Sequence, residues 1–500
     1  MKKVVFKHII WISIVVMIVL FSCIFIFKRD FDSTVNKASK NLNTYTIDAT
    51  LDKDMKITAN ARVEINKDYA SGNEYVFFNL YPRAFREDAK IRPYTNLNQG
   101  KCFSNGQSFG NLEVNSVKVN GVSQDVVYDG EDENALKVKC DETSSKNIIE
   151  LDFATSLPNC NHRLGFMGDN INLGNWYPVL ATIKDGKFEI SPYYEIGDPF
   201  CSDVANYFVN FSFPEEYNPA HTGKMLSLER GETNHLKVEA KAVRDFAMVL
   251  SKKFEVQEIQ LKNTCVKYYG YMGDSDLNFA AELAKEALMF FNAKFGEYPY
   301  RDLCVVKSPF LFGGMEYPGL VIVADNIESS DDLAKVIVHE IAHQWWYGVV
   351  GNNEITEAWL DESLTEYSSL LFFENNSKYN MSYENLVEDA KNTYELYIDV
   401  ITSLGGTVDT RMNDRVNNYS SEYEYSYLIY VKGVVMLDDI RTEIGEKKMY
   451  KALQKYYKQN KFKIASSEDL LQSFRKVAGD KTTSKFNNYL NGEKRTKALN

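Results

Sequence analysis

Apolar and polar residues alternate with a period of two through much of the first half of the chain. The pattern is clearest in residues 45–51, 55–65, 74–80, 147–153, 207–213 and 247–250. Short runs of this kind, separated by turn residues, predict an antiparallel all-β domain over residues 44–258, built as a sandwich or saddle. Within 117–122 the dipeptide Asn120-Gly121 favours a two-residue hairpin turn.

The period of the pattern changes near residue 258. Residues 275–295 place apolar side chains at helical spacing, whereas 304–306 and 320–323 have the composition of buried strands. The acidic pair Asp331-Asp332 suits the positive N-terminal end of the apolar helix that follows, and the pattern from there on is mostly helical. These features predict an α+β domain over residues 259–500, directly after the β domain. Residues 31–43 are polar and are predicted to form a linker ahead of the β domain.

The N-terminal segment has the hydropathy of a membrane span. Residues 9–27 contain no charged side chain and follow Lys2, Lys3 and Lys7. As a helix this run is long enough to cross a hydrocarbon core of ~30 Å. It predicts a transmembrane anchor over residues 1–30, in a single-pass protein of the cell membrane with extracellular folded domains. Two alternatives are a lipoprotein anchor at Cys23, where 20–23 loosely resembles a lipobox, and a cleaved signal peptide.

Composition places the chain among globular multidomain proteins. Of its 500 residues, 44% are apolar and 25% charged, and the formal net charge is −12. An acidic chain without a long basic run disfavours nucleic acid as a partner. Seven cysteines occur, six of them beyond the predicted anchor. Disulfides and buried free thiols are both compatible with this number, and the spacing selects no pairing.

The strongest chemical signal is His339-Glu340-Ile341-Ala342-His343, inside the apolar segment 336–346. On a helix the two imidazoles project from one face, about one turn apart, where both can bind one zinc ion. Glu340 is rotated by about 100° from His339 and reaches a metal-bound water as general base. Six histidines in 500 residues make a chance occurrence rare. A purely structural histidine pair is the alternative.

Two histidines leave a tetrahedral zinc site incomplete, and the segment Trp359-Leu360-Asp361-Glu362-Ser363 supplies a third ligand. Glu362 begins a second amphipathic helix, far enough after His343 for the chain to turn back. We therefore predict one zinc ion per chain, bound by His339, His343 and Glu362. Glu366, one turn further on, either orients a ligand or is simply exposed, and the exposed position is the simpler expectation.

These segments resemble the zinc metallo-aminopeptidases of the aminopeptidase N and leukotriene hydrolase type. The resemblance rests on four motifs in the family's order and on shorter matches in the β-like half, and it extends over roughly residues 44–489. The four motifs are 313–318 (Gly-Gly-Met-Glu-Tyr-Pro), 339–345, 359–363 and 430–433 (Tyr-Val-Lys-Gly), and the shorter matches are 174–178, 197–200 and 244–246.

The resemblance implies a β domain followed by a thermolysin-like, gluzincin catalytic domain, and a role for each matching residue. Glu316 corresponds to the glutamate that binds the α-amino group of the substrate, with Gly313, Gly314 and Met315 beside the peptide. Tyr430 corresponds to the tyrosine that stabilises the oxyanion. The implied protein is a membrane-anchored zinc aminopeptidase, which hydrolyses the first bond of peptides with a free N-terminus, with Glu340 as general base.

The chain departs from the family pattern in several places. Asp361 and Ser363 replace the usual Asn and Gly beside the third ligand, and Cys201 stands where Tyr is expected. No counterpart of the family's second amine-binding residue is recognisable, and we expect no long helical C-terminal domain, which leaves the cleft more open. Two other functions remain as alternatives: a thermolysin-like endopeptidase, and a non-catalytic surface or transport-associated protein on the same scaffold.

Overall fold

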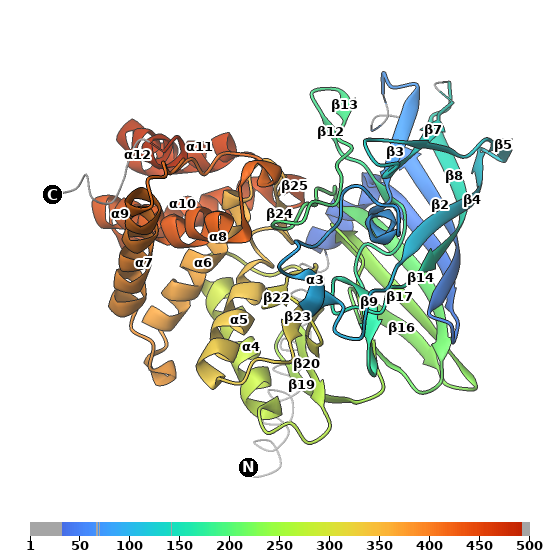
Figure 1. Cartoon of the computed structure of the whole chain (residues 1–500), viewed down its shortest axis with the longest axis horizontal. Helices are drawn as coiled ribbons and strands as arrows, with labels where there is room; N and C mark the ends of the chain where they lie inside the picture. The colour runs from blue at the N-terminus through green and yellow to red at the C-terminus, as the bar shows by residue number, and fades with distance from the viewer. Residues whose placement is uncertain (1–32, 67–68, 70, 142, 493–500) are drawn as a thin grey trace, which may run out of the picture.

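The structure is a computed structural model, and it describes residues 33–66, 69, 71–141 and 143–492. A β-rich part contains the strands up to β18, and a second part combines one sheet with nearly all of the helices. Figure 1 shows the β-rich part on the right and the helices α4 to α12 on the left. The prediction of a β-rich domain followed by a helical catalytic-type domain therefore fits the structure.

The β-rich part is built on an eight-stranded sheet with the order β16-β17-β14-β1-β2-β8-β4-β5. Most neighbours in it are antiparallel, and β1 and β14 pair in parallel. The bounds of its strands are β1 Thr44–Leu51, β2 Lys56–Asn66, β4 Asn111–Val119, β5 Val122–Gln124, β8 Lys146–Ser156, β14 Ala205–Pro214, β16 Lys224–Glu229 and β17 Thr233–Val243.

Two four-stranded sheets accompany the large sheet. The first has the order β15-β18-β10-β9, and the second has the order β11-β3-β7-β6. Their strands are β3 Tyr75–Asn79, β6 Val127–Asp129, β7 Ala135–Lys139, β9 Leu164–Met167, β10 Asn170–Leu173, β11 Val179–Leu180, β15 Asn218–His221 and β18 Met248–Ser251. Three short elements, β12 Ile183–Lys184, β13 Lys187–Phe188 and α3 Gln99–Cys102, lie in the connections.

Local chemistry explains how these strands are joined. Between β1 and β2, the Asp52 carboxylate accepts hydrogen bonds from the backbone N–H of Asp54 at 2.9 Å and of Lys56 at 3.0 Å, which closes the turn. Between β4 and β5, Asn120 and Gly121 have φ values of 51° and 82°. Two consecutive positive φ values are what a two-residue hairpin turn requires. Alternate side chains along β1 and β2 are buried, as the period of two predicts.

The second part begins with a five-stranded sheet with the order β19-β20-β21-β23-β22. Strands β20, β21 and β23 are parallel to one another, and the outer strands β19 and β22 run antiparallel to their neighbours. The bounds are β19 Phe254–Gln260, β20 Cys265–Tyr271, β21 Asp302–Ser308, β22 Gly314–Met315 and β23 Leu320–Ala324. Helices α4 and α5 pack against this sheet and against each other.

Helices α6 to α12 form a bundle that contacts α5 through α6. The bounds of the helices from α4 onward are α4 Leu277–Lys294, α5 Ser330–Ala342, α6 Trp359–Glu374, α7 Tyr383–Ser403, α8 Glu422–Ser426, α9 Lys432–Ile444, α10 Glu446–Asn460, α11 Ser467–Ala478 and α12 Asp480–Leu490. A π-helical turn, η5 Tyr427–Val431, joins α8 to α9 without a break. Shorter elements are η1 Ser39–Asn41, η2 Tyr81–Phe85, η3 Ser377–Tyr379, η4 Val416–Asn418, β24 Val350–Gly351 and β25 Lys463–Ile464.

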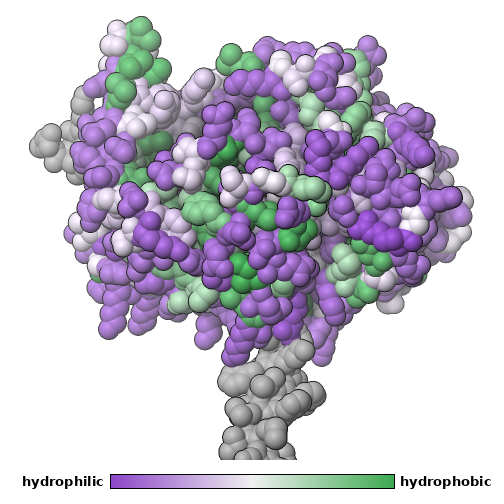
Figure 2. All heavy atoms as spheres, turned by 90° about the horizontal axis from the view of Figure 1, so that it is seen from below, coloured by the Kyte–Doolittle hydropathy of each residue, from purple (hydrophilic) through white to green (hydrophobic). Residues whose placement is uncertain are grey.

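The molecule has two apolar cores. One fills the β-rich part and continues onto one side of the five-stranded sheet, at residues such as Val306 and Ile322. The other lies among the helices, where the side chains of Trp345, Trp346 and Trp359 are completely buried. The face of the molecule in Figure 2 is mainly hydrophilic, with hydrophobic residues in small patches near its middle. The cleft described below lies where loops of the β-rich part meet α5, α6 and α8.

The predicted transmembrane anchor is contradicted. Within the described part of the chain, no helix is long and apolar enough to cross a membrane. Helix α4 is an example. It has the length of a span, but it carries Glu282, Lys285 and Glu286 and is therefore apolar on one face only. The predictions of a transmembrane helix and of a single-pass location in the cell membrane are therefore wrong. Residues 9–27 and Cys23 lie outside the described residues.

All six cysteines of the described chain are free thiols, and five of them are buried. The sequence is compatible with disulfides and with buried free thiols, and the structure has free thiols, five of them buried. Burial raises the pKa of the Cys201 and Cys304 thiols to about 12, so both are protonated at neutral pH.

Candidate metal centre and active site

Helices α5 and α6 bring the three predicted metal ligands together. The Nε2 atoms of His339 and His343 lie 3.1 Å apart, and Glu362 Oε2 lies 3.3 Å and 3.2 Å from them. Four ligands around zinc at ~2.0–2.1 Å form a tetrahedron whose edges are about 3.3–3.4 Å. The three atoms are thus spaced as one face of such a tetrahedron, and all three side chains line the cleft.

The outer nitrogen of each imidazole is also held. His339 Nδ1 lies 2.8 Å from Glu366 Oε2, and His343 Nδ1 lies 3.0 Å from the carbonyl oxygen of Trp346 and 3.1 Å from Thr365 Oγ1. Donors fixed in this way keep both Nε2 lone pairs aimed at the common point. The expectation that Glu366 is simply exposed is therefore wrong, because its carboxylate is a partner of His339.

The electrostatics of Glu362 fit a cation at this point. Burial by itself favours the neutral acid, but His343 and His339 hold the pKa of Glu362 well below its usual range. Its Oε2 atom is buried, and among the described residues it has no hydrogen-bond donor other than the imidazoles. Two imidazoles and one carboxylate, buried and converging, form a donor set that divalent zinc prefers.

Glu340 points from α5 toward the segment at residues 313–318. A Cβ atom on Gly314 would lie 2.2 Å from Glu340 Oε1, so only glycine leaves room for this carboxylate. Burial raises the pKa of Glu340 to about 7. Its Oε2 atom has no partner within the described chain. The group therefore has the position and the proton affinity of a general base.

The other predicted substrate residues lie on β22 and directly beside it. Met315 is buried, and its sulfur accepts a hydrogen bond from Arg163 Nε at 3.1 Å. Glu316 is 3% exposed, and its Oε1 atom has no hydrogen-bond partner in the described chain. Burial, and then the nearby Asp198, raise the pKa of Glu316. Gly313 is exposed at the rim of the cleft.

Tyr430 lies on the π-helical turn η5, with its ring stacked on His339 at a centroid distance of 5.9 Å and an angle of 19°. Ser363 on α6 explains the turn, since its hydroxyl donates to the Ile429 carbonyl at 2.6 Å. Gly433 allows the close approach of α9, because a Cβ atom there would lie 2.4 Å from Ser363 Oγ. The departure at Ser363 thus supports the turn that positions Tyr430.

Two residues of the β-rich part complete the site, and sequence reasoning assigned them no role. Asp198 forms a buried ion pair with Arg163. Oxygen atoms of Asp198, Glu316 and Glu362 all lie within 4.8 Å of one another. Asp198 belongs to the segment 197–200, and the resemblance of this segment to the family was the one signal in the sequence that could have identified Asp198.

Asp361, which also departs from the family pattern, is buried and accepts a hydrogen bond from Asn352 Nδ2 at 2.9 Å.

These side chains line a cavity of about 360 Å³. Its two cationic side chains are Arg163 and Lys335, and its six carboxylates are Asp198, Glu316, Glu340, Glu362, Glu366 and Glu422. A negative cavity favours a cationic ligand group, such as a metal ion or a protonated amine.

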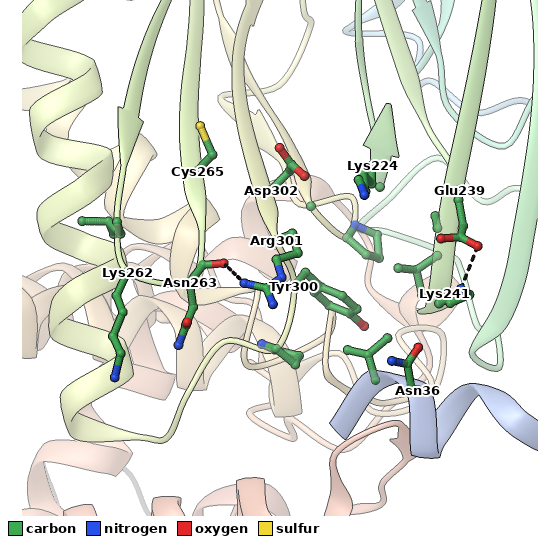
Figure 3. A pocket seen from close by; sticks show the side chains of 18 of the residues that line it. Asn36, Lys224, Glu239, Lys241, Lys262, Asn263, Cys265, Tyr300, Arg301 and Asp302 are labelled. Carbon is green, nitrogen blue, oxygen red and sulfur yellow. Dashed lines mark hydrogen bonds and ion pairs between the residues drawn. The ribbon is translucent and has the colours of Figure 1, made fainter. Parts of the chain in front are cut away.

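A larger cavity of about 740 Å³ lies behind the loop, where β16 and β17 meet β20 and β21 (Figure 3). There Lys241 pairs with Glu239 at 2.7 Å, and Asp302 pairs with Lys267 at 2.9 Å. Among the described residues, the clusters that could hold a metal use none of its lining side chains. The smaller cavity is therefore the candidate active site, although it is not the largest hollow.

Comparison with known proteins agrees with this geometry. The model of the peptidase family M1 domain matches residues 279–489. Residues 279–489 of this chain therefore resemble an M1 peptidase domain. The match contains the zincin helix, the third-ligand segment and Tyr430, so the predicted family resemblance is confirmed.

Curated proteins that this chain resembles in sequence are named as aminopeptidases. The chain is 29% identical over 231 residues to aminopeptidase 2 of Candida albicans, which covers 43% of this chain and 24% of that protein. It is 24% identical over 380 residues to aminopeptidase N of Lactobacillus helveticus, which covers 72% of this chain and 44% of that protein. The chain thus spans less than half the length of these curated relatives.

Solved structures show that the fold extends beyond the M1 domain. An M1 zinc metallopeptidase from Deinococcus radiodurans superposes with a TM-score of 0.62 at 15% identity, over 91% of this chain and 95% of that one. Aminopeptidase A of Legionella pneumophila gives 0.64 at 16% identity, over 90% of this chain and 49% of that one. Both the β-rich part and the helical part are therefore shared with these proteins.

Proposed function

We propose that the protein is a zinc aminopeptidase that hydrolyses the N-terminal peptide bond of peptides. His339, His343 and Glu362 would hold the zinc ion, which when bound supplies a Lewis acid for the scissile carbonyl and for a water molecule. Support comes from the three ligand atoms 3.1–3.3 Å apart and from the M1 domain that contains them. The names of the sequence relatives, aminopeptidases 2 and N, agree with this activity.

The observation that carries the exopeptidase assignment is the spacing around Glu316. Ligand atoms of Glu316, Glu340 and His343 all lie within 4.8 Å of one another. In a peptide the amino nitrogen lies only about 2.5 Å from the carbonyl carbon of the same residue. An ammonium group bound to Glu316 therefore places the first peptide bond beside Glu340 and the metal ligands, and no longer N-terminal extension fits between them.

Glu316 also distinguishes a free amine from an acylated one. Its buried carboxylate has an oxygen without a partner, and a substrate ammonium offers the charge-assisted hydrogen bond that this oxygen lacks. Asp198, held by Arg163, adds a second carboxylate on the same side and fills the role for which the sequence offered no candidate. An N-acetylated peptide offers no charge and leaves the buried Glu316 oxygen unpaired.

The proton transfers follow from the position of Glu340. In its ionised form the carboxylate accepts a proton from the attacking water, and it then delivers that proton to the nitrogen of the leaving amine. The Tyr430 hydroxyl, fixed by the η5 turn above His339, donates a hydrogen bond to the oxygen on which negative charge develops. Gly313 and Gly314 let the peptide backbone approach the loop closely.

The test is a panel of aminoacyl reporter substrates with the purified protein, together with its zinc content. We expect one zinc ion per chain and release of the reporter, and loss of this release in Glu340→Gln with zinc retained. A protein without bound zinc that hydrolyses no aminoacyl reporter would contradict the proposal and favour the non-catalytic alternative. Reporter release that survives Glu340→Gln would contradict the mechanism.

A further inference from the structure

Gln344, the residue after His343, connects the helix of the metal ligands to the loop that carries Glu316. Its side chain is completely buried. Gln344 Oε1 accepts a hydrogen bond from the backbone N–H of Gly319 at 2.8 Å. Its Nε2 group donates to the carbonyl oxygens of Glu316 at 3.4 Å and of Tyr317 at 3.3 Å. One amide therefore binds the loop on both sides of Pro318.

The opposite side of this loop borders a cavity. Pro318 and Gly319 line the 740 Å³ cavity shown in Figure 3, whose labelled side chains belong to the β-rich part, to the strands β20 and β21 and to the loops that precede these two strands. A Cβ atom added at Gly319 would be in ordinary contact, 3.6 Å from the Tyr298 hydroxyl and 3.7 Å from the Asp302 carbonyl oxygen. The side chains of Met315 and Tyr317 are packed in the core, so core packing and hydrogen bonds together set the position of the loop.

Other hydrogen bonds hold the loop to other elements. The Tyr317 hydroxyl donates to Asn175 Oδ1 of the β-rich part at 3.3 Å, and the N–H of Cys304 on β21 donates to the Gly319 carbonyl at 2.9 Å. These bonds fix the loop relative to the β-rich part and the sheet. The bonds to Gln344 fix it relative to α5, which carries His339, Glu340 and His343.

We propose that Gln344 is a positioning residue that sets the distance between the amine-binding carboxylate of Glu316 and the catalytic centre. This inference rests on the proposed function and deepens it, because that distance decides which peptide bond is cleaved. A displacement of the loop by about 1 Å is enough to lower the rate of a reaction that depends on alignment by ~100-fold. Gln344 touches neither substrate nor metal ligand side chain and acts through the loop.

The experiment compares wild type with Gln344→Met, which has a similar length and no strong hydrogen-bonding group. Both proteins are given an aminoacyl reporter with a free amine and the same reporter with an acetylated amine. We expect KM for the free amine to rise at least ~10-fold in Gln344→Met, and the ratio of kcat/KM between free and acetylated substrate to fall at least ~10-fold. Bound zinc should stay at one ion per chain.

A second readout is independent of turnover. Calorimetric titration of the zinc-free proteins with a free amino acid such as L-leucine measures binding of the amine alone. We expect the affinity to be ~10-fold lower in Gln344→Met than in wild type. The matched control is Gln454→Met, which removes a single exposed hydrogen bond to the Lys294 carbonyl; neither residue lines the cleft, and the substitution should change neither readout.

Three results would overturn the proposal. The first is a folded, zinc-loaded Gln344→Met whose KM and selectivity stay within twofold of wild type. The second is an equal loss of kcat/KM for both substrates, which indicates a structural role only. If Gln344→Met does not fold, Gln344→Glu replaces it, since the carboxylate still accepts from Gly319 but cannot donate, and failure of both to fold is the third. A wild type without preference for the free amine contradicts the proposed function before any variant is compared.

Discussion

Each of the two parts of the molecule buries a pair of histidines, and the two pairs have opposite surroundings. In the β-rich part His162 lies among the rings of Phe85, Tyr193 and Phe312, and His221 lies at the end of β15. Burial, and then Arg163, lower the pKa of His162, and burial lowers that of His221 to about 4. Both are neutral core residues at neutral pH.

In the helical part, burial acts on His339 and His343 in the same direction but is outweighed. Glu362 and Glu366 raise the pKa of His339, and Glu316 and Glu362 raise that of His343. The comparison shows that burial alone does not make an imidazole functional. The carboxylates that share its environment create the affinity for a cation, whether that cation is a proton or a metal.

The strongest test of this comparison replaces one histidine by glutamine in each part. His343→Gln removes a metal ligand, and we expect bound zinc to be lost and kcat/KM to fall by at least ~10³-fold. His221→Gln replaces a core imidazole by an amide of similar size, and zinc content and activity should stay within about threefold of wild type. Metal analysis and reporter kinetics on both proteins measure this. Equal zinc loss in both would contradict the assignment.

Glu340→Gln separates binding of the metal from its use. The substitution keeps the shape of the side chain and leaves the three ligands in place, so zinc content should not change. Removal of the general base is expected to lower kcat by about 10²–10⁴-fold. Metal analysis combined with kcat gives the answer. Loss of zinc from this variant would mean that Glu340 holds the metal rather than the proton.

The pH dependence of the free energy of unfolding should show that His221 is neutral in the folded protein. Because the pKa of His221 is about 4 in the folded protein and 6.5 when exposed, the unfolded chain takes up the proton first as the pH falls. Stability is therefore lost between pH 6.5 and 4, by roughly 3 kcal/mol from this residue. Urea unfolding of zinc-free wild type and His221→Gln across this range measures the difference. Parallel curves for the two proteins would show that His221 does not titrate in this way.

Glu366→Gln should produce the smallest effect. The variant replaces the carboxylate 2.8 Å from His339 Nδ1 by a neutral amide, which still orients the ring but no longer raises its basicity. Zinc affinity is expected to fall by about 10–100-fold, with kcat nearly unchanged once zinc is saturating. Competition with a metal chelator measures the affinity. An unchanged affinity would show that the contact between Glu366 and His339 does not contribute to zinc binding.

The sequence contained enough information for the site because its groups lie in short, local motifs. The spacing of His339 and His343 determines their geometry on any helix, and Glu362 follows within a single helix–turn–helix unit. The alternating segments likewise predicted strands such as β1, β2 and β8, whose side chains are buried on one face.

What the sequence did not reveal depends on contacts between distant segments. Asp198 and Arg163 come from loops of the β-rich part, and no local pattern relates them to α5. The role of Glu366 depends on the packing angle of α5 and α6, which brings its carboxylate to His339. The transmembrane prediction used hydropathy and length alone, and no described helix supports it.

The central claim is that Glu316 selects substrates by their free amine, and one ratio tests it most directly. This ratio is kcat/KM for an aminoacyl reporter with a free amine divided by that for its N-acetylated form, measured in wild type and in Glu316→Gln. We predict a ratio of at least ~100 in wild type that falls to below ~10 in the variant, with zinc content unchanged. Equal cleavage of both substrates by the wild type would contradict the account and identify an endopeptidase.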